Sequence, residues 1–89
     1  MSQNYVKDPD AVLDYPMNWA DWLDGDTIST STWTVPDGIT KDSDSKTTSA
    51  TTIWLSGGTA GLDYTLINHI VTAAGREDDR TIIIKVREK

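Results

Sequence analysis

The sequence has 89 residues and a mass of 9.8 kDa, which allows one domain with one hydrophobic core. It contains no cysteine, which excludes a disulfide scaffold, a thiolate zinc site and a cysteine nucleophile. The net charge of −6 disfavours binding to nucleic acid. The longest aliphatic run, Ile82–Ile84, is far shorter than the ~18–20 apolar residues that span a bilayer, and the first residues lack a signal-peptide pattern. We therefore expect neither nucleic acid nor a membrane as a partner.

The negative charge is concentrated in the first half of the chain. Residues 1–44 hold nine aspartates against two lysines, a net charge of −7, whereas residues 45–89 hold six basic and five acidic residues, a net charge of +1. We expect the acidic half to meet a basic surface on a partner. Such docking should weaken as the salt concentration rises, because salt screens exposed charges.

Composition and periodicity both favour β-strands. The chain has 13 Thr, 8 Ile, 4 Trp and 3 Tyr but no Phe, which is typical of a β-rich domain. No twelve-residue window shows a clear helical period. In chain order we expect a short edge segment at residues 8–16, one helical turn at 17–23, and strands at 27–35, 39–42, 51–55, 62–72 and 81–87. Residues 42–46 are predicted as a solvated loop and 74–79 as a hairpin connection.

The strand at residues 62–72 differs from its neighbours because both of its faces carry apolar side chains. Leu66 and Ile70 lie on one face, and Ile67 and Val71 lie on the other. This pattern suits a central strand, or a long strand that changes its buried face at a bulge.

Six or seven short antiparallel strands in a chain of this length predict an all-β, immunoglobulin-like β-sandwich. We expect residues 1–24 to form an extended N-terminal arm rich in aromatic and acidic residues, and residues 25–89 to form the sandwich. Tyr64, near the start of a late strand, fits the tyrosine corner of such folds, in which the hydroxyl bonds back to the backbone.

No set of residues forms a convincing catalytic or cofactor site. His69 is the only histidine and lies in the middle of a strand, where a surface position is the default. The glycine-rich segment Gly57–Gly61 joins two strands, and no lysine follows it to neutralise a phosphate. Asp21, Asp24 and Asp26 lack the spacing and closing Glu of an EF-hand. We expect no enzymatic activity, no cofactor and no metal.

The aromatic residues of the N-terminal segment give the candidate binding site. Trp19 and Trp22 are three residues apart, so one helical turn projects both rings to the same side, and Tyr15 precedes them. Asp14 and Asp21 would form an acidic rim around these rings, as in an interface hot spot. The alternative is that the tryptophans close one end of the sandwich as part of its core. A third interpretation is a carbohydrate-binding platform that uses these rings with Asn18 and Asp21.

The order of several motifs along the chain resembles a known family. These motifs are Lys7–Tyr15, Trp19, Trp22-Leu23, Gly25–Ile28, Ile53–Gly61, Tyr64–Asn68 and Gly75–Arg80. Together they resemble small structural proteins of tailed bacteriophages, often labelled fiber-tail adaptor proteins, over nearly the whole chain.

The resemblance implies a non-enzymatic virion component, made in the cytoplasm of the host bacterium, that acts as an adaptor or decoration subunit. It implies symmetric copies that contact other virion proteins of the tail, fiber, neck or capsid. The alternative function is a carbohydrate-binding or adhesive β-sandwich module.

Overall fold

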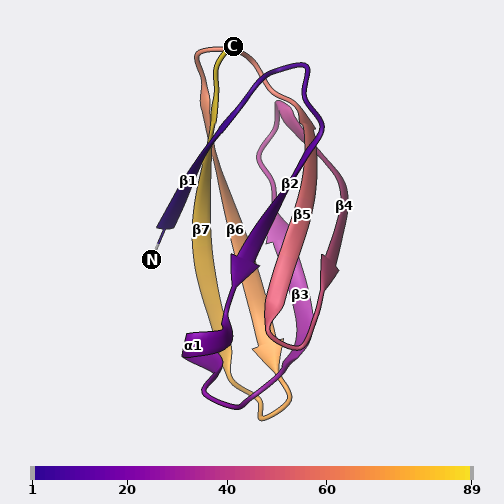
Figure 1. Ribbon diagram of the computed structural model, residues 1–89, viewed down its shortest axis with the longest axis vertical. Coiled ribbons are helices and arrows are strands. Elements are labelled where there is room, and N and C mark those ends of the chain that lie inside the picture. The colour runs from indigo at the N-terminus through magenta and orange to yellow at the C-terminus, as the bar shows by residue number, and fades with distance from the viewer. Residues whose placement is uncertain (1, 89) are drawn as a thin grey trace.

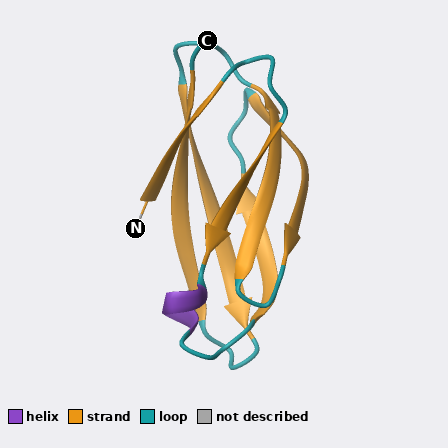
Figure 2. Cartoon of the chain, viewed as in Figure 1, coloured by secondary structure: helices purple, strands orange, loops and turns teal. Residues whose placement is uncertain are grey.

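The computed structural model describes residues 2–88, which form seven strands and one short helix (Figure 1). The elements are β1 (Ser2–Lys7), β2 (Leu13–Asn18), α1 (Ala20–Leu23), β3 (Ile28–Thr34), β4 (Ile39–Lys46), β5 (Ala50–Gly57), β6 (Asp63–Thr72) and β7 (Glu77–Val86). Strands and short loops make up almost all of the elongated molecule, which measures 41 × 22 × 19 Å (Figure 2). The helix has four residues, and no helix of the described chain is long and apolar enough to cross a membrane.

The strands form two sheets that pack face to face. One sheet has the order β1-β7-β6-β3 and the other has the order β2-β5-β4. All neighbouring pairs are antiparallel except β1 and β7, which are parallel. The three-stranded sheet matches strands B, E and D of a constant-type immunoglobulin domain, and β3, β6 and β7 match strands C, F and G. The predicted immunoglobulin-like all-β sandwich is confirmed.

Alternation of side chains along the strands builds the core between the sheets. On β6 the buried residues recur at every second position, and the same holds for the C-terminal half of β7. The buried hydrophobic side chains are Tyr15, Met17, Trp19, Leu23, Ile28, Ile39, Ile53, Leu55, Tyr64, Leu66, Ile70, Ile82, Ile84 and Val86. Burying one such aliphatic side chain contributes about 1.5–3 kcal/mol, so these inner faces dominate the stability of the domain.

Tyr64 forms the expected tyrosine corner at the connection between β5 and β6. Its hydroxyl accepts a hydrogen bond from the backbone N–H of Thr59 at 2.9 Å. The ring also lies against Gly38, where an added Cβ would come within 3.0 Å of the ring. Gly38 has a φ of +100°, so glycine suits this position both for space and for backbone conformation.

The N-terminal segment belongs to the sandwich, which corrects the domain boundary expected between residues 24 and 25. β1 is an edge strand of the four-stranded sheet, and β2 is an edge strand of the three-stranded sheet. The prolines limited this segment to an edge, as expected: Pro16 lies in β2, where one side of the strand needs no hydrogen-bond donors. The segment is extended, but its own sheet partners order it.

Two other boundaries differ from the expected ones. β4 continues through residues 42–46, which were expected to form a loop, because backbone pairing with β5 reaches Lys46. β4 is a polar edge strand that is exposed after Ile39, and its charged side chains discourage pairing with other chains. β7 begins at Glu77, because the ladder with β6 extends to the pair Val71–Glu77.

Candidate protein interface

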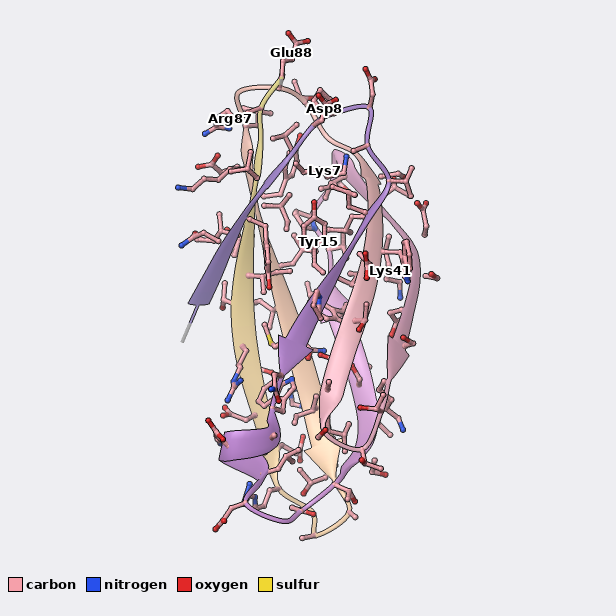
Figure 3. The ribbon with its side chains drawn as sticks, viewed as in Figure 1. Lys7, Asp8, Tyr15, Lys41, Arg87 and Glu88 are labelled. Atoms are coloured by element: carbon pink, nitrogen blue, oxygen red, sulfur yellow. The ribbon has the colours of Figure 1, made fainter. Side chains whose placement is uncertain are left out.

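Trp19 and Tyr15, two of the three rings expected at a subunit contact, lie in the core. Trp19 is fully buried, and its indole Nε1 donates a hydrogen bond to Asn68 Oδ1 at 3.0 Å. Tyr15 is 5% exposed, points between the sheets (Figure 3), and packs with its ring centroid 4.9 Å from that of Tyr5. Burial, together with the neighbouring charge of Asp14 and Tyr5, raises the pKa of the Tyr15 hydroxyl. The expectation that these two rings anchor a neighbouring subunit is corrected.

Trp22 lies in α1, is half-buried and forms an aromatic pair with Trp19. Its ring packs edge-to-face on Trp19, with the centroids 5.5 Å apart. The guanidinium of Arg76 lies 4.2 Å from the Trp22 ring centroid and donates a hydrogen bond to the Trp22 carbonyl. Arg80 covers Trp19 in the same way, at 4.2 Å, and donates to the carbonyl of Asn18. These contacts fix α1 to the β6–β7 hairpin within one chain.

The density of aspartates around these rings predicts an interface, because many carboxylates are poorly compatible with burial of all three rings in the core. In the structure the exposed side chain of Asp21 lies beside buried rings, since successive positions of the turn point in different directions. The opposite charges come from Arg76 and Arg80, more than fifty residues away in sequence. Local sequence reasoning has no signal for this pairing.

Trp54 is the large aromatic side chain that the structure exposes, with 40% of its surface accessible. It points outward from β5 because its neighbours Ile53 and Leu55 point into the core. The surrounding outer surface of the three-stranded sheet, here called the Trp54 face, includes Asp14 and Pro16 on β2, Thr52, Trp54 and Ser56 on β5, and Thr40, Ser43 and Ser45 on β4. Trp54 alternates with the inward-facing residues Thr51, Ile53 and Leu55 of its strand. This alternation is the sequence signal that could have identified Trp54 as an outward-facing residue.

The Trp54 face combines an aromatic centre with an acidic border. Asp14 is the direct cross-strand neighbour of Trp54 on β2 and is exposed. On the other side, Asp42 Oδ1 accepts a hydrogen bond from Ser56 Oγ at 3.0 Å. Lys41, at the outer edge strand (Figure 3), forms an ion pair with Asp44 at 3.1 Å, so its charge is locally compensated. Of the predicted interface residues, Asp14 belongs to this face, whereas Asp21 and Trp22 lie near α1.

Lys7 is buried at the opposite end from α1 and has a structural role. Its ammonium donates hydrogen bonds to the backbone carbonyls of Gly57, at 2.7 Å, and Asp8, at 2.9 Å. Burial lowers the pKa of Lys7, and the nearby charges of Asp8, Asp10 and Asp42 oppose this shift. The contact joins the end of β1 to the end of β5.

His69 forms a charged cluster on the outer surface of the four-stranded sheet. Its Nδ1 lies 2.5 Å from Asp79 Oδ1, and its Nε2 lies 3.0 Å from Glu77 Oε1. The histidine comes from β6 and both carboxylates come from β7. This places the histidine on the surface, as expected, but in contact with two acids.

We predict that His69 titrates above its ordinary pKa of about 6.5. Hydrogen bonds to Asp79 and then to Glu77 raise the pKa of the imidazole. A raised folded-state pKa means that the stabilisation is complete below the unfolded pKa and is lost as pH rises through the folded pKa. Urea unfolding of the wild type and of His69→Gln should therefore converge as pH rises above neutrality. Equal differences at all pH values would contradict this, and NMR titration of the imidazole checks the pKa directly.

A family comparison decides which kind of protein carries these surfaces. The family model described as "Podophage GP4 fiber-tail adaptor protein gp77" matches residues 7–85. The chain belongs to this fiber-tail adaptor family. The match covers β2 to β6 and most of β7, so the resemblance seen in the sequence motifs is confirmed. No curated protein matches the sequence.

The described part of this fiber-tail adaptor family member offers surfaces for contact and no enclosed site. Within residues 2–88 no pocket is detected, and no group of three or more His, Asp or Glu side chains could hold a metal ion. The family is a phage structural adaptor family. Its contacts must therefore be sought on exposed faces such as the Trp54 face.

Proposed function

We propose that the chain is a non-enzymatic structural subunit of a phage virion that connects fiber and tail proteins through the Trp54 face. The observation that carries the proposal is the exposed Trp54 on the central strand of the three-stranded sheet in a member of the fiber-tail adaptor family. Tryptophan is enriched among the residues that contribute most to protein–protein binding, particularly at the centre of a contact.

The chemistry of the face defines the partner surface that it fits. Asp14 lies directly opposite Trp54, Asp42 is hydrogen-bonded to Ser56 on the same face, and the first half of the chain carries a net charge of −7. A partner with a shallow apolar depression bordered by Lys or Arg would match both the indole and the acids. Symmetric repetition in the particle strengthens such a contact, because each copy adds to the total affinity.

The proposal is tested by adding purified chain to phage particles assembled without it. We expect Trp54→Ser to reduce incorporation at least about tenfold, since losing a central aromatic anchor typically costs ~2–4 kcal/mol. The matched control is Leu62→Ser, because Leu62 is also exposed, at 52%, but lies outside the Trp54 face. Both variants should melt near the wild-type temperature. Normal incorporation of Trp54→Ser would contradict the proposal.

The electrostatic part of the proposal has its own readout. Wild-type incorporation should fall as salt rises from about 50 to about 500 mM, because the border charges are screened over ~8–10 Å. Asp14→Asn should flatten this dependence without abolishing incorporation. Salt-independent incorporation of the wild type would contradict a charge-matched partner. A shift in tryptophan fluorescence with simple glycans, lost in Trp54→Ser, would instead support a carbohydrate-binding module.

A further inference from the structure

The outer surface of β6 and β7 is apolar where an exposed sheet surface would be polar. Ile67 is 36% exposed, and Ile83 and Val71 are half-buried, although the inner sides of the same strands already fill the core. A sheet with one side in water normally alternates apolar inward and polar outward residues. Residues 62–72 therefore form a central strand with two apolar faces, as expected. The outward face, which holds Ile67 and Val71, is not covered by any other element of the described chain.

Charged residues are arranged along this surface, called the β6–β7 face, with opposite signs at its two ends. It consists of Asp63, Thr65, Ile67, His69 and Val71 on β6, Glu77, Asp79, Thr81, Ile83 and Lys85 on β7, and Arg87 after β7. One end holds the cross-strand pair Asp63–Lys85, with Arg87 bonded to Asp63 at 2.9 Å. The other end holds the cluster of His69 with two acids. About 20 Å separates the two ends, at ~3.3 Å per residue.

We propose that the β6–β7 face binds the same face of a second copy of this chain, with the strands antiparallel. The pair is generated by a two-fold axis that lies between the β6–β7 faces of the two copies. This axis is perpendicular to the strands and passes at the level of Leu66 and Ile82. It places Asp79 opposite Lys85 of the second copy, and Glu77 opposite Arg87 of the second copy. On β6 it places His69 opposite Asp63 of the second copy, while Ile67 and Ile83 meet at the centre.

The charge pattern favours this perpendicular axis over a two-fold axis that lies between the faces and runs parallel to the strands. A two-fold axis parallel to the strands would gather the acidic ends of both copies, with four carboxylates from Glu77 and Asp79, at one end of the contact, whereas the perpendicular axis places each acidic end on the basic end of the second copy. The face carries three carboxylates, two basic side chains and His69, so it is close to neutral although the chain has a net charge of −6. The remaining acids lie outside the contact, where salt screens their repulsion.

The size of the face sets the strength of the expected contact. The outer surface of the whole sheet β1-β7-β6-β3, with strands ~4.8 Å apart and about 20 Å long, covers roughly 400 Å² per copy, so a pair that also brings β1 and β3 into contact buries about 800 Å² in total. This lies below the range of stable complexes, so we expect weak, concentration-dependent dimers in solution. In a particle that holds several copies close together, such a contact becomes effectively intramolecular.

Sedimentation velocity of the full-length chain between about 10 μM and about 1 mM tests the proposal, since weak contacts of this size populate there. We expect the wild type to shift from monomer towards dimer and Ile67→Lys to remain monomeric, with melting temperatures confirming that both are folded. Trp54→Ser should dimerise as the wild type does, because Trp54 lies on the opposite sheet. This control separates failure of the dimer from failure of the proposed function.

Charge reversal gives the sharper test of the geometry. Asp79→Lys and Lys85→Asp should each fail to self-associate, because each places like charges opposite each other twice. An equimolar mixture of the two variants should recover dimers, since both cross-contacts then pair a lysine with an aspartate. A wild type that is monomeric throughout, a dimer that survives Ile67→Lys, or a mixture that does not recover would overturn the proposal.

Discussion

Replacement of Trp19 by alanine is expected to lower the free energy of unfolding by about 3–5 kcal/mol. Trp19 is fully buried, so the substitution leaves a large cavity between the sheets. It also leaves Asn68 without the indole donor, and Arg80 without the ring on which it lies. Domains of this length have total stabilities of roughly 4–13 kcal/mol, so a large part of the stability should be lost.

Urea unfolding at constant pH measures the loss, and Trp22→Ala is the matched control. Trp22 is half-buried, and its ring contacts Trp19 and Arg76 from the outside. We expect Trp22→Ala to cost less than half as much as Trp19→Ala. If Trp19→Ala instead kept the wild-type melting temperature and prevented incorporation into particles, the ring would belong to a subunit contact after all.

The sequence was sufficient to predict the sheet architecture because the signals for it are local. Alternation identified β6 and the C-terminal half of β7, and glycine and proline clusters marked the turns between strands. The tyrosine corner could be predicted because it depends on one side chain and a nearby backbone group. Local patterns could not assign Ser2–Lys7 to a sheet, since its parallel partner β7 lies more than seventy residues away.

The candidate interface was harder to predict because exposure is a property of the folded chain. Trp19 and Trp54 are the same residue type with acidic neighbours, yet one is buried and the other is 40% exposed. What separates them is the register: Trp19 follows the inward positions of β2, whereas Trp54 is out of phase with Ile53 and Leu55. Grouping the aromatics by sequence proximity therefore selected the core cluster, and strand phase would have selected Trp54.

Two outward faces on opposite sheets suit an adaptor, because one subunit can contact two neighbours at once. The acidic half of the sequence supplies β2 and β4, which flank Trp54, while β6 and β7 come from the half with a net charge of +1. In formal charge the two faces are alike, because β2 and β4 carry three aspartates against two lysines and the β6–β7 face carries three carboxylates against two basic side chains. A rigid core between the sheets is then required to hold the faces in a fixed relation, and Asn68 is at its centre.

Asn68 is fully buried and links both sheets through a polar network. Its Oδ1 accepts hydrogen bonds from Trp19 Nε1 and from Thr51 Oγ1, at 3.0 and 2.7 Å. Its Nδ2 donates to Ser31 Oγ and to the carbonyl of Thr32, at 2.9 and 3.1 Å. The Asn68 amide therefore uses both of its N–H donors and both acceptor positions of its oxygen. Such a satisfied network fixes the relative position of the two sheets.

A double-mutant cycle between Asn68→Leu and Trp19→Phe should therefore show coupling of about 1–2 kcal/mol. Asn68→Leu alone leaves the buried indole N–H without its acceptor and should cost about 2–4 kcal/mol in urea unfolding. Trp19→Phe removes that N–H, so Asn68→Leu should cost less in its presence than in the wild type. The control cycle pairs Asn68→Leu with Tyr64→Phe, whose hydroxyl bonds to Thr59 instead, and should be additive. If the Trp19 cycle were also additive, the hydrogen bond would contribute nothing specific, and packing of the apolar side chains alone would hold the two sheets in register.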